Sequence, residues 1–371
     1  MGFGVFVLFA GMFVPFPSHG FAYLYGFTLC LPALILIVWK PGSVQTLWRH
    51  RSTKWVVLLL LWSLLSLAWS TDRSVADWLG RYVTICLFLY AWSRVFEGRE
   101  HRVYGFVLVI GAVATVAALA AFAVHEPQVL DGDRIQGFGR LSNTNDAAAA
   151  ASVLAICLSV IPCKETWQHV ARWIMVAVLI AFVCLTFSRG AWGSLFAAFV
   201  VVLFCRRNLL NKKVLWLLPV VILVAVLVMF LFLPQLTARD WSHRPAIMLH
   251  NFHTFLLSPW IGIGQGTPVH FYVDSTFIWQ AQNMFAQLAI QLGLPGLILF
   301  LLIWLPLGWR GWLHRHEPLG CLVLALWVFT TLQGQVELPY LIESPSISWL
   351  CAWLPLVISY SLQPKRAVES P

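Results

Sequence analysis

Long apolar stretches follow one another along most of the chain, and polar segments separate them. An α-helix needs about 20 apolar residues to cross the hydrocarbon core of a bilayer, so the shorter stretches must borrow flanking residues. The pattern predicts an all-α polytopic membrane protein with about twelve transmembrane helices. The predicted spans are residues 3–15, 21–39, 55–69, 78–92, 103–124, 147–161, 173–187, 191–205, 214–233, 284–307, 319–332 and 347–362.

Two of the polar segments are long, and both are predicted on the same side of the membrane. The first covers residues 125–146 and the second covers residues 234–283. Long loops are more often functional than merely connecting. Residues 245–257 are amphipathic enough to form a helix at the membrane surface, so we expect short amphipathic helices in the second loop. The remaining loops have no room for another domain, and residues 1–371 are predicted to form a single membrane domain.

The composition agrees with this fold class and excludes a soluble domain. Hydrophobic residues make up 60% of the chain, charged residues make up 11%, and the mean hydropathy is +0.80. A soluble domain has about 25% charged residues. The eight cysteines lie in the apolar stretches or at their ends, so neither a disulfide framework nor a zinc site is expected.

The lysines and arginines fall into two unequal groups that alternate along the chain. The larger group contains every lysine, and the positive-inside rule therefore assigns it, together with both termini, to the cytoplasm. Its members are Lys40, Arg49, Arg51, Lys54, Arg94, Arg99, Arg102, Lys164, Arg172, Arg206, Arg207, Lys212, Lys213, Arg310, Arg315, Lys365 and Arg366. The formal net charge of +9 follows mainly from this excess, so nucleic acid is not expected as a partner.

The smaller basic group contains arginines alone, at positions where topology does not require positive charge. Its members are Arg73, Arg81, Arg134, Arg140, Arg189, Arg239 and Arg244. A guanidinium group binds phosphate with two parallel hydrogen bonds, so this set predicts a surface for phosphate or pyrophosphate. Two members have simpler alternatives. Arg81 could pair with Asp77 four residues earlier, and Arg189 could be a snorkelling arginine at a helix end.

Two short patterns in the long loops favour turns over ligand sites. The glycine-rich run at residues 262–266 resembles a nucleotide-binding loop, but no βαβ unit surrounds it. We expect a tight turn there that lets the backbone approach its neighbours closely. Asp131 and Asp133 flank Gly132, a pattern that forms turns more often than metal sites. No metal ion and no cofactor is predicted.

Four segments between residues 134 and 296 combine glycine with asparagine or arginine in a recognisable order. They are Gly137-Phe138-Gly139-Arg140-Leu141-Ser142-Asn143-Thr144-Asn145; Ser188-Arg189-Gly190-Ala191; Arg244 followed by Ser258-Pro259-Trp260-Ile261-Gly262-Ile263-Gly264; and Gln282-Asn283-Met284-Phe285 followed by Gln291-Leu292-Gly293-Leu294-Pro295-Gly296. Their order and spacing resemble the motifs of the O-antigen ligase superfamily. This superfamily includes lipopolysaccharide O-antigen ligases, O-antigen polymerases and pilin oligosaccharyltransferases.

The resemblance implies an enzyme of the bacterial inner membrane whose active site faces the periplasm. Its donor would be a glycan on undecaprenyl pyrophosphate, and its acceptor would be the hydroxyl of a lipid or glycan such as lipid A-core. Membrane lipids would surround it, and neither nucleotide nor metal would take part. A polymerase of the same superfamily is the first alternative. A polysaccharide flippase or transporter is the second, although no midplane charge pair and no paired broken helices favour it.

The resemblance also assigns roles to individual residues. Arg189 and Arg244 match the motif arginines and are predicted to stabilise the departing pyrophosphate. The superfamily usually has histidine where this chain has Gln282, which can orient a hydroxyl but cannot take its proton at neutral pH. His270 is therefore predicted as the substitute base, while an ordinary loop histidine and a reaction without a base are the alternatives. The residues predicted to bind substrate are Arg81, Arg134, Arg140, Asn143, Asn145 and Asn283.

Overall fold

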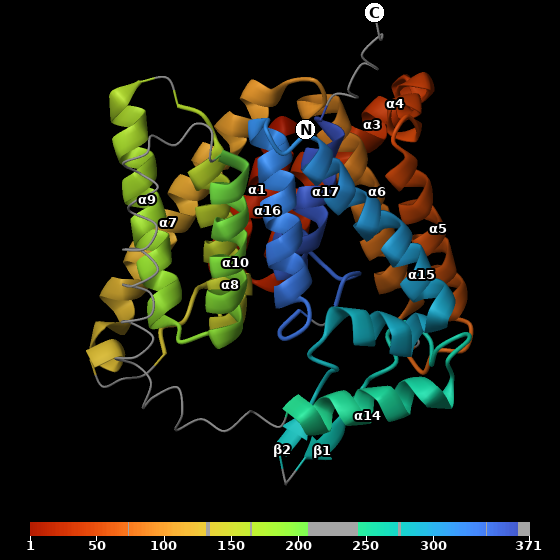
Figure 1. Ribbon diagram of the computed structural model, residues 1–371. Helices are drawn as coiled ribbons and strands as arrows, with labels where there is room; N and C mark the ends of the chain where they lie inside the picture. Colours follow the sequence, from red (N-terminus) through yellow and green to blue (C-terminus); the bar gives the residue numbers. More distant parts are fainter. Residues whose placement is uncertain are drawn as a thin grey trace, which may run out of the picture.

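A computed structural model describes residues 1–72, 74–130, 134–163, 165–206, 244–273, 276–338 and 340–362. Within these ranges the chain forms a bundle of helices that stand side by side (Figure 1). Five helical segments are long and apolar enough to cross a membrane, and four shorter apolar helices accompany them. The predicted class, a helical membrane protein, is confirmed. The number of spans stays a prediction.

The helices coincide with the predicted spans wherever the structure describes them, whereas span 214–233 lies outside the described residues. The first part of the chain contains α1 (Gly2–Ala10), α2 (Ser18–Tyr25), α3 (Leu31–Trp39), α4 (Gln45–Trp48), α5 (Arg51–Ser66), α6 (Val75–Phe96) and α7 (Glu100–Leu130). The second part contains α8 (Thr144–Val160), α9 (Thr166–Leu185), α10 (Arg189–Arg206), α14 (Arg244–Leu257), α15 (Met284–Leu313), α16 (Pro318–Gln333) and α17 (Leu354–Tyr360).

Helix α8 lies inside the bundle, and every residue from Ala147 to Val160 is buried. It packs against α7, α9, α10 and α16. The run of five alanines at its start leaves little side-chain volume, which lets neighbouring helices approach closely, as small residues do at helix contacts in membranes. The first turn of α8 therefore lies among other helices, and its polar residues Asn145 and Asp146 face neighbours from distant parts of the chain.

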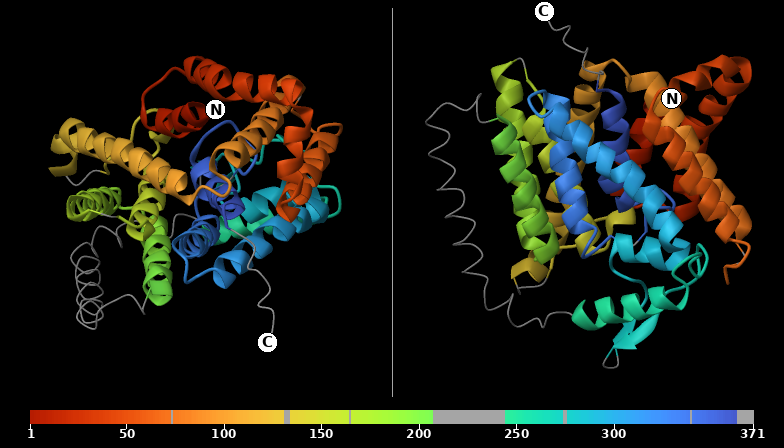
Figure 2. Two further views of the ribbon diagram at one scale, coloured as in Figure 1. Left: turned by 90° about the horizontal axis from the view of Figure 1, so that it is seen from above. Right: turned by 45° about the vertical axis from the view of Figure 1, so that its right-hand side comes forward.

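The described members of the two groups of basic residues lie at opposite ends of the bundle. Helix α14 crosses the end drawn at the bottom of Figure 1, and the starts of α8 and α10 lie at the same end; Figure 2 gives the same arrangement from two other sides. The ends of α6, α10 and α15 that carry Arg94, Arg206 and Arg310 lie at the other end. The separation of the two groups is what a membrane orientation set by charge requires.

The first long loop is shorter than predicted, because α7 continues to Leu130. The prediction of residues 125–146 was wrong at this end, since the polar residues that end the apolar stretch do not end the helix. A short 3₁₀ turn at Gly139–Leu141 precedes α8. The predicted turn at 131–133 lies outside the described residues.

The second long loop contains a surface helix, as predicted, and a hairpin that was not predicted. Helix α14 begins at Arg244 and ends at Leu257, which confirms the amphipathic helix at residues 245–257. Strands β1 (Phe271–Val273) and β2 (Thr276–Ile278) pair antiparallel, with Phe271 opposite Ile278. Strands of three residues are too short to produce a recognisable alternation of polar and apolar positions. Residues 234–243 of this loop lie outside the described part of the chain.

The glycine-rich turn packs backbone to backbone on a break in α15. Gly293 interrupts the helix with φ 66° and ψ −169°. The amide of Ile263 donates to Ile290 O at 2.9 Å, and the amide of Gly264 donates to Gln291 O at 3.0 Å. A Cβ on Gly262 would lie 2.3 Å from Gln291 O. The predicted tight turn is confirmed, and it fixes the start of α15 against the segment that follows α14.

Candidate functional site

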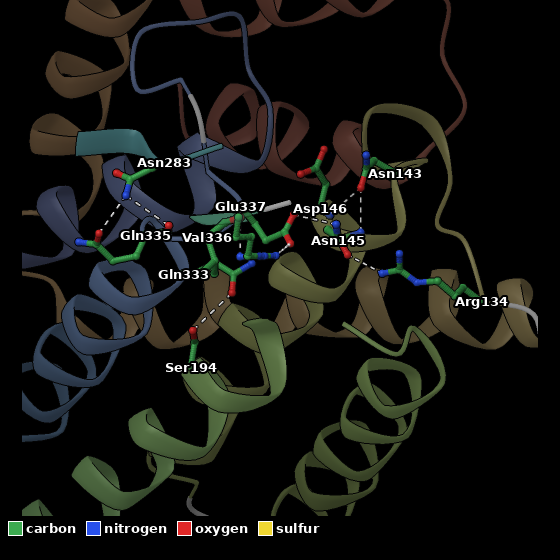
Figure 3. A network of polar contacts seen from close by, with 11 residues as sticks. Arg134, Asn143, Asn145, Asp146, Ser194, Asn283, Gln333, Gln335, Val336 and Glu337 are labelled. Atoms are coloured by element: carbon green, nitrogen blue, oxygen red, sulfur yellow. Dashed lines mark hydrogen bonds and ion pairs between the residues drawn. The ribbon is translucent and has the colours of Figure 1, made fainter. Parts of the chain in front are cut away.

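A polar cluster lies at the α14 end of the bundle and is centred on Glu337, in the segment that follows α16 (Figure 3). Glu337 Oε1 accepts a hydrogen bond from Arg244 Nη2 at 2.6 Å. Glu337 Oε2 accepts one from Asn145 Nδ2 at 2.7 Å. Asn145 Oδ1 in turn accepts a hydrogen bond from Arg134 Nη2. We call Arg134, Asn145, Arg244 and Glu337 the Glu337 cluster.

Helix α8 fixes one side of this cluster. Asn143 is its N-cap and accepts hydrogen bonds from the amides of Asn145 and Asp146, as asparagine does at a helix start. Capping sets the direction of the first turn and thereby presents Asn145 to Glu337. Arg134 makes a second hydrogen bond, in which its Nε donates to Thr186 O at 2.7 Å. That carbonyl lies two residues before the Ser188-Arg189-Gly190 motif.

Helices α10 and α15 fix the other side by holding the segment 333–337. A Cβ on Gly190 would lie 2.9 Å from Val336 Cγ2, so glycine allows α10 to approach this segment. Asn283 caps α15 and donates through Nδ2 to Gln335 Oε1 at 3.0 Å. The amide of Met284 donates to Gly334 O at 2.7 Å. Residues of all four motif segments therefore meet at residues 333–337, through Asn145, Gly190, Arg244 and Asn283.

The electrostatics of the cluster combine burial with opposing charge. Burial raises the pKa of Glu337, while the positive charges of Arg244 and Arg134 and the hydrogen bonds from Arg244 and Asn145 act in the opposite direction. Burial also raises the pKa of Glu343, against hydrogen bonds from Ser346 and Ser348. The charges of Arg81 and Arg140 reach Glu343. Arginines thus act on both carboxyl groups.

Arg81 and Arg140 are the two arginines whose charges reach Glu343, and the guanidinium of each lies over an aromatic ring. The guanidinium of Arg81 is 4.1 Å from the centre of the Trp78 ring, and that of Arg140 is 5.7 Å from the Phe21 ring. The alternative of an ion pair between Asp77 and Arg81 is wrong, since these two described residues form none and Trp78 takes the guanidinium instead. The Nε of Arg140 is buried without a hydrogen-bond partner among the described residues.

The acidic half of this site was not predicted from the sequence. Asp146 interacts electrostatically with both Glu337 and Glu343, so three carboxyl groups lie near the predicted arginines. The sequence does contain a signal for it, because Glu337 and Glu343 are the only acidic residues between predicted spans 319–332 and 347–362. The pattern of basic residues does not contain this signal.

Several predicted residues lie outside the Glu337 cluster. Arg189 is exposed at the first position of α10, next to Gly190. His270 is exposed just before β1, and its ring centre is 5.7 Å from that of Phe277. None of the contacts described for His270 joins it to the cluster. Gln282 has a left-handed backbone, with φ 51°, directly before the cap of α15. Asn143 and Asn283 use their side-chain oxygens as helix caps.

An apolar cavity of 330 Å³ lies between α14 and the start of α15. Met248, Phe252 and Phe255 line it from α14, and Phe285 and Leu297 line it from α15. Asn283, which bonds the segment 333–337, also reaches this cavity. Arg244 bonds the same segment and begins α14, the helix that lines one side of the cavity. Among the described residues, no group of three or more His, Cys, Asp or Glu could hold a metal ion.

Comparison with known families supports the resemblance seen in the sequence. Residues 174–301 match the family model described as O-antigen ligase. The matched range contains the Ser188-Arg189-Gly190 motif, Arg244, the glycine-rich turn and the start of α15. The predicted superfamily is confirmed over this range. A search of curated proteins finds no match to the chain.

Proposed function

Because the chain carries an O-antigen ligase domain over residues 174–301, we propose that it transfers a glycan from undecaprenyl pyrophosphate to an acceptor hydroxyl. The acceptor is lipid A-core in this proposal, which makes the protein a ligase. Its active site faces the periplasm, the protein lies in the bacterial inner membrane, and neither nucleotide nor metal takes part. The larger group of basic residues supports this orientation.

The Glu337 cluster is the observation that carries the proposal. Arg134 and Arg244 come from segments more than 100 residues apart, and the same carboxylate holds them, directly or through Asn145. Transfer breaks the bond between the anomeric carbon and the pyrophosphate, and negative charge develops on the leaving oxygen. Donors already in place stabilise that charge without reorganisation, which is how electrostatic catalysis lowers a barrier. Arg189, at the start of α10, is a third donor in this proposal.

The apolar cavity between α14 and the start of α15 supports a lipid-linked donor. Hydrocarbon carried by the pyrophosphate would lie along Phe252 and Phe255 of α14, while the pyrophosphate would lie toward Arg244 at the start of the same helix. A helix N-terminus also favours a negative charge. Both substrate parts would therefore contact one element.

The proton of the acceptor hydroxyl needs a group to receive it. His270 stays a candidate, although contacts with the hairpin hold it rather than contacts with the cluster. Asp146 and Glu343 form a second set of candidates, since carboxylates in a buried environment are stronger bases than exposed ones. Gln282 would orient the acceptor hydroxyl in either case.

Gel analysis of lipopolysaccharide from a deletion strain tests the proposal. Loss of a ligase leaves core without O-antigen, and the plasmid-borne gene should restore the ladder. A band of core plus one repeat would instead identify a polymerase. Accumulation of the lipid-linked unit inside the cell would identify a flippase. A normal ladder in the deletion strain would rule out all three activities for this protein.

A further inference from the structure

A second and larger cavity lies between the start of α5 and the ends of α15 and α17. These helix ends lie at the end of the bundle opposite α14 (Figure 1). Its volume is 870 Å³. The rings of His50 and Tyr360, both in its wall, stack in parallel with centres 4.2 Å apart. Tyr360 is fixed further by a hydrogen bond of 3.1 Å to Thr53. The cavity is therefore built between packed helix ends.

The polar part of the cavity is basic. Arg49, Arg51 and Arg310 line it, and Glu97 is the only acidic residue among the described lining residues. Arg310 is held in place, since its Nη2 donates to Leu362 O at 3.2 Å. Burial and the positive charges of Arg310 and Arg49 lower the pKa of His50 to about 4. Glu97 Oε1 lies 3.3 Å from His50 Nε2, and the three arginines supply the positive charge of this cavity.

The remaining wall is apolar and continues along α15. Leu302, Pro306, Trp309 and Leu313 line the cavity at spacings of three or four residues, which places them on one face of the helix. Trp309 is 61% exposed and Leu302 is 37% exposed. This face therefore extends from the basic part of the cavity along α15, toward the middle of that helix. Hydrocarbon can cover it along this length.

We propose that this cavity binds one anionic phospholipid, with the phosphate at Arg49, Arg51 and Arg310 and an acyl chain along Leu302, Pro306 and Trp309. Arginine forms charge-assisted, often paired, hydrogen bonds with phosphate oxygens. Basic pockets between transmembrane helices recognise anionic headgroups in this way. The apolar face of α15 selects a lipid over a free phosphate ion, because an ion alone would leave that face without a partner.

Native mass spectrometry of the full chain in a neutral detergent tests the proposal. The protein is mixed with phosphatidylglycerol or with phosphatidylcholine of the same acyl chains, with and without inorganic phosphate. We expect one retained phosphatidylglycerol, little phosphatidylcholine, and no displacement by millimolar phosphate. Equal retention of the two lipids would overturn the proposal. Displacement by inorganic phosphate would also overturn it, by assigning the site to a free anion.

A pair of double variants locates the binding. Arg49→Gln with Arg51→Gln should weaken phosphatidylglycerol binding by about thirtyfold, since both exposed arginines contribute near a phosphate. Lys40→Gln with Arg99→Gln removes two exposed charges from outside the cavity and should retain the lipid. Equal loss in both double variants would contradict the assigned site. The comparison of the two lipids on the unchanged protein does not depend on the folding of any variant.

Discussion

Glu337 is the residue on which the arrangement of the candidate site depends. It accepts a hydrogen bond from Arg244 at one carboxylate oxygen and from Asn145 at the other. Arg244 also donates through Nη1 to Val336 O at 3.2 Å. The planar guanidinium thus bonds two neighbouring residues of one segment, and its orientation toward a substrate is set by that double contact.

Arg244→Lys tests whether this fork geometry matters. Lysine keeps the charge but cannot bond Val336 and Glu337 with the same fixed geometry. We expect transfer to fall by a barrier increase of about 2–4 kcal/mol, comparable with the loss of one oxyanion-hole donor. Arg189→Lys should act similarly if that residue also contacts the pyrophosphate. Arg99→Lys, at the other end of the bundle, is the matched control. Near-normal turnover of both site variants in an in-vitro transfer assay would remove these arginines from the reaction.

Glu337→Gln tests the role of the carboxylate through the pH profile. Burial raises the pKa of Glu337, so the side chain takes up a proton at a higher pH than an exposed glutamate would. As the pH falls through that raised pKa, the ion pair with Arg244 is lost and transfer should decline. The variant should be less active at neutral pH and should lack this acidic decline. An identical acidic decline in the variant would assign it to another group.

His270 and Gln282 are tested together, because each is a candidate for handling the acceptor hydroxyl. If His270 is the base, His270→Ala should abolish transfer or steepen its pH dependence, while Gln282→Ala should have a milder effect. Gln282→His should be tolerated and should raise activity if a titratable nitrogen beside Asn283 helps. The measurement is transfer activity from about pH 5 to pH 9, which brackets the unperturbed histidine pKa. Full activity and a flat profile in His270→Ala would leave the carboxylates as the candidates.

At the scale of elements, two glycine-containing segments recognise each other through their backbones. The turn at residues 259–264 and the break at Gly293 exchange amide hydrogen bonds, and Leu294 N adds one to Pro259 O at 2.8 Å. A Cβ on Gly293 would lie 2.5 Å from Trp260 O. The glycines of these two motifs therefore hold the start of α15, and with it Asn283, in a fixed position.

Gly262→Ala tests this packing. The residue has φ +69°, and a Cβ would lie 2.3 Å from Gln291 O, so alanine meets both backbone strain and a clash. We expect the variant to unfold at a clearly lower temperature in detergent, for a loss of more than about 1 kcal/mol. Gly193→Ala is the matched control, because nothing lies within 4 Å of its Cβ position in α10. Equal thermal stability of the two variants would mean that the turn does not stabilise the fold.

Apolar length predicted where the helices lie, but it did not predict what brings them together. The helix at residues 245–257 and the turn at 262–266 were readable, because each has a local signal in side-chain periodicity or glycine content. Glu337 was not predicted to be part of the site. Its partners Asn145 and Arg244 are distant in sequence. The packing of α8 on α16 brings Asn145 to Glu337, and the packing of α14 on α15 and of α15 on α16 brings Arg244 there. Helix α7 is longer than its apolar stretch, because the polar residues that follow the stretch continue the helix to Leu130.

At the scale of the whole molecule, the two ends of the bundle differ in charge and in cavities. One end contains the Glu337 cluster and the described arginines of the smaller group. The other contains the larger basic cavity and the helix ends with Arg94, Arg206 and Arg310. The proposed transfer uses the end with the Glu337 cluster, and the difference in charge between the two ends would direct insertion.

Labelling of introduced cysteines in intact cells tests the orientation on which every site assignment depends. Ser142→Cys, exposed at the α14 end, should react with an impermeant thiol reagent from the periplasm. Arg99→Cys, exposed at the other end, should react only after the membrane is permeabilised. A cysteine near Lys212, outside the described residues, should behave like Arg99→Cys. The unchanged protein, with its eight cysteines in helices or beside them, gives the background. Labelling of Arg99→Cys from outside would show that the orientation is the reverse of the one assigned. The Glu337 cluster would then face the cytoplasm and not the periplasm, where the proposed transfer takes place.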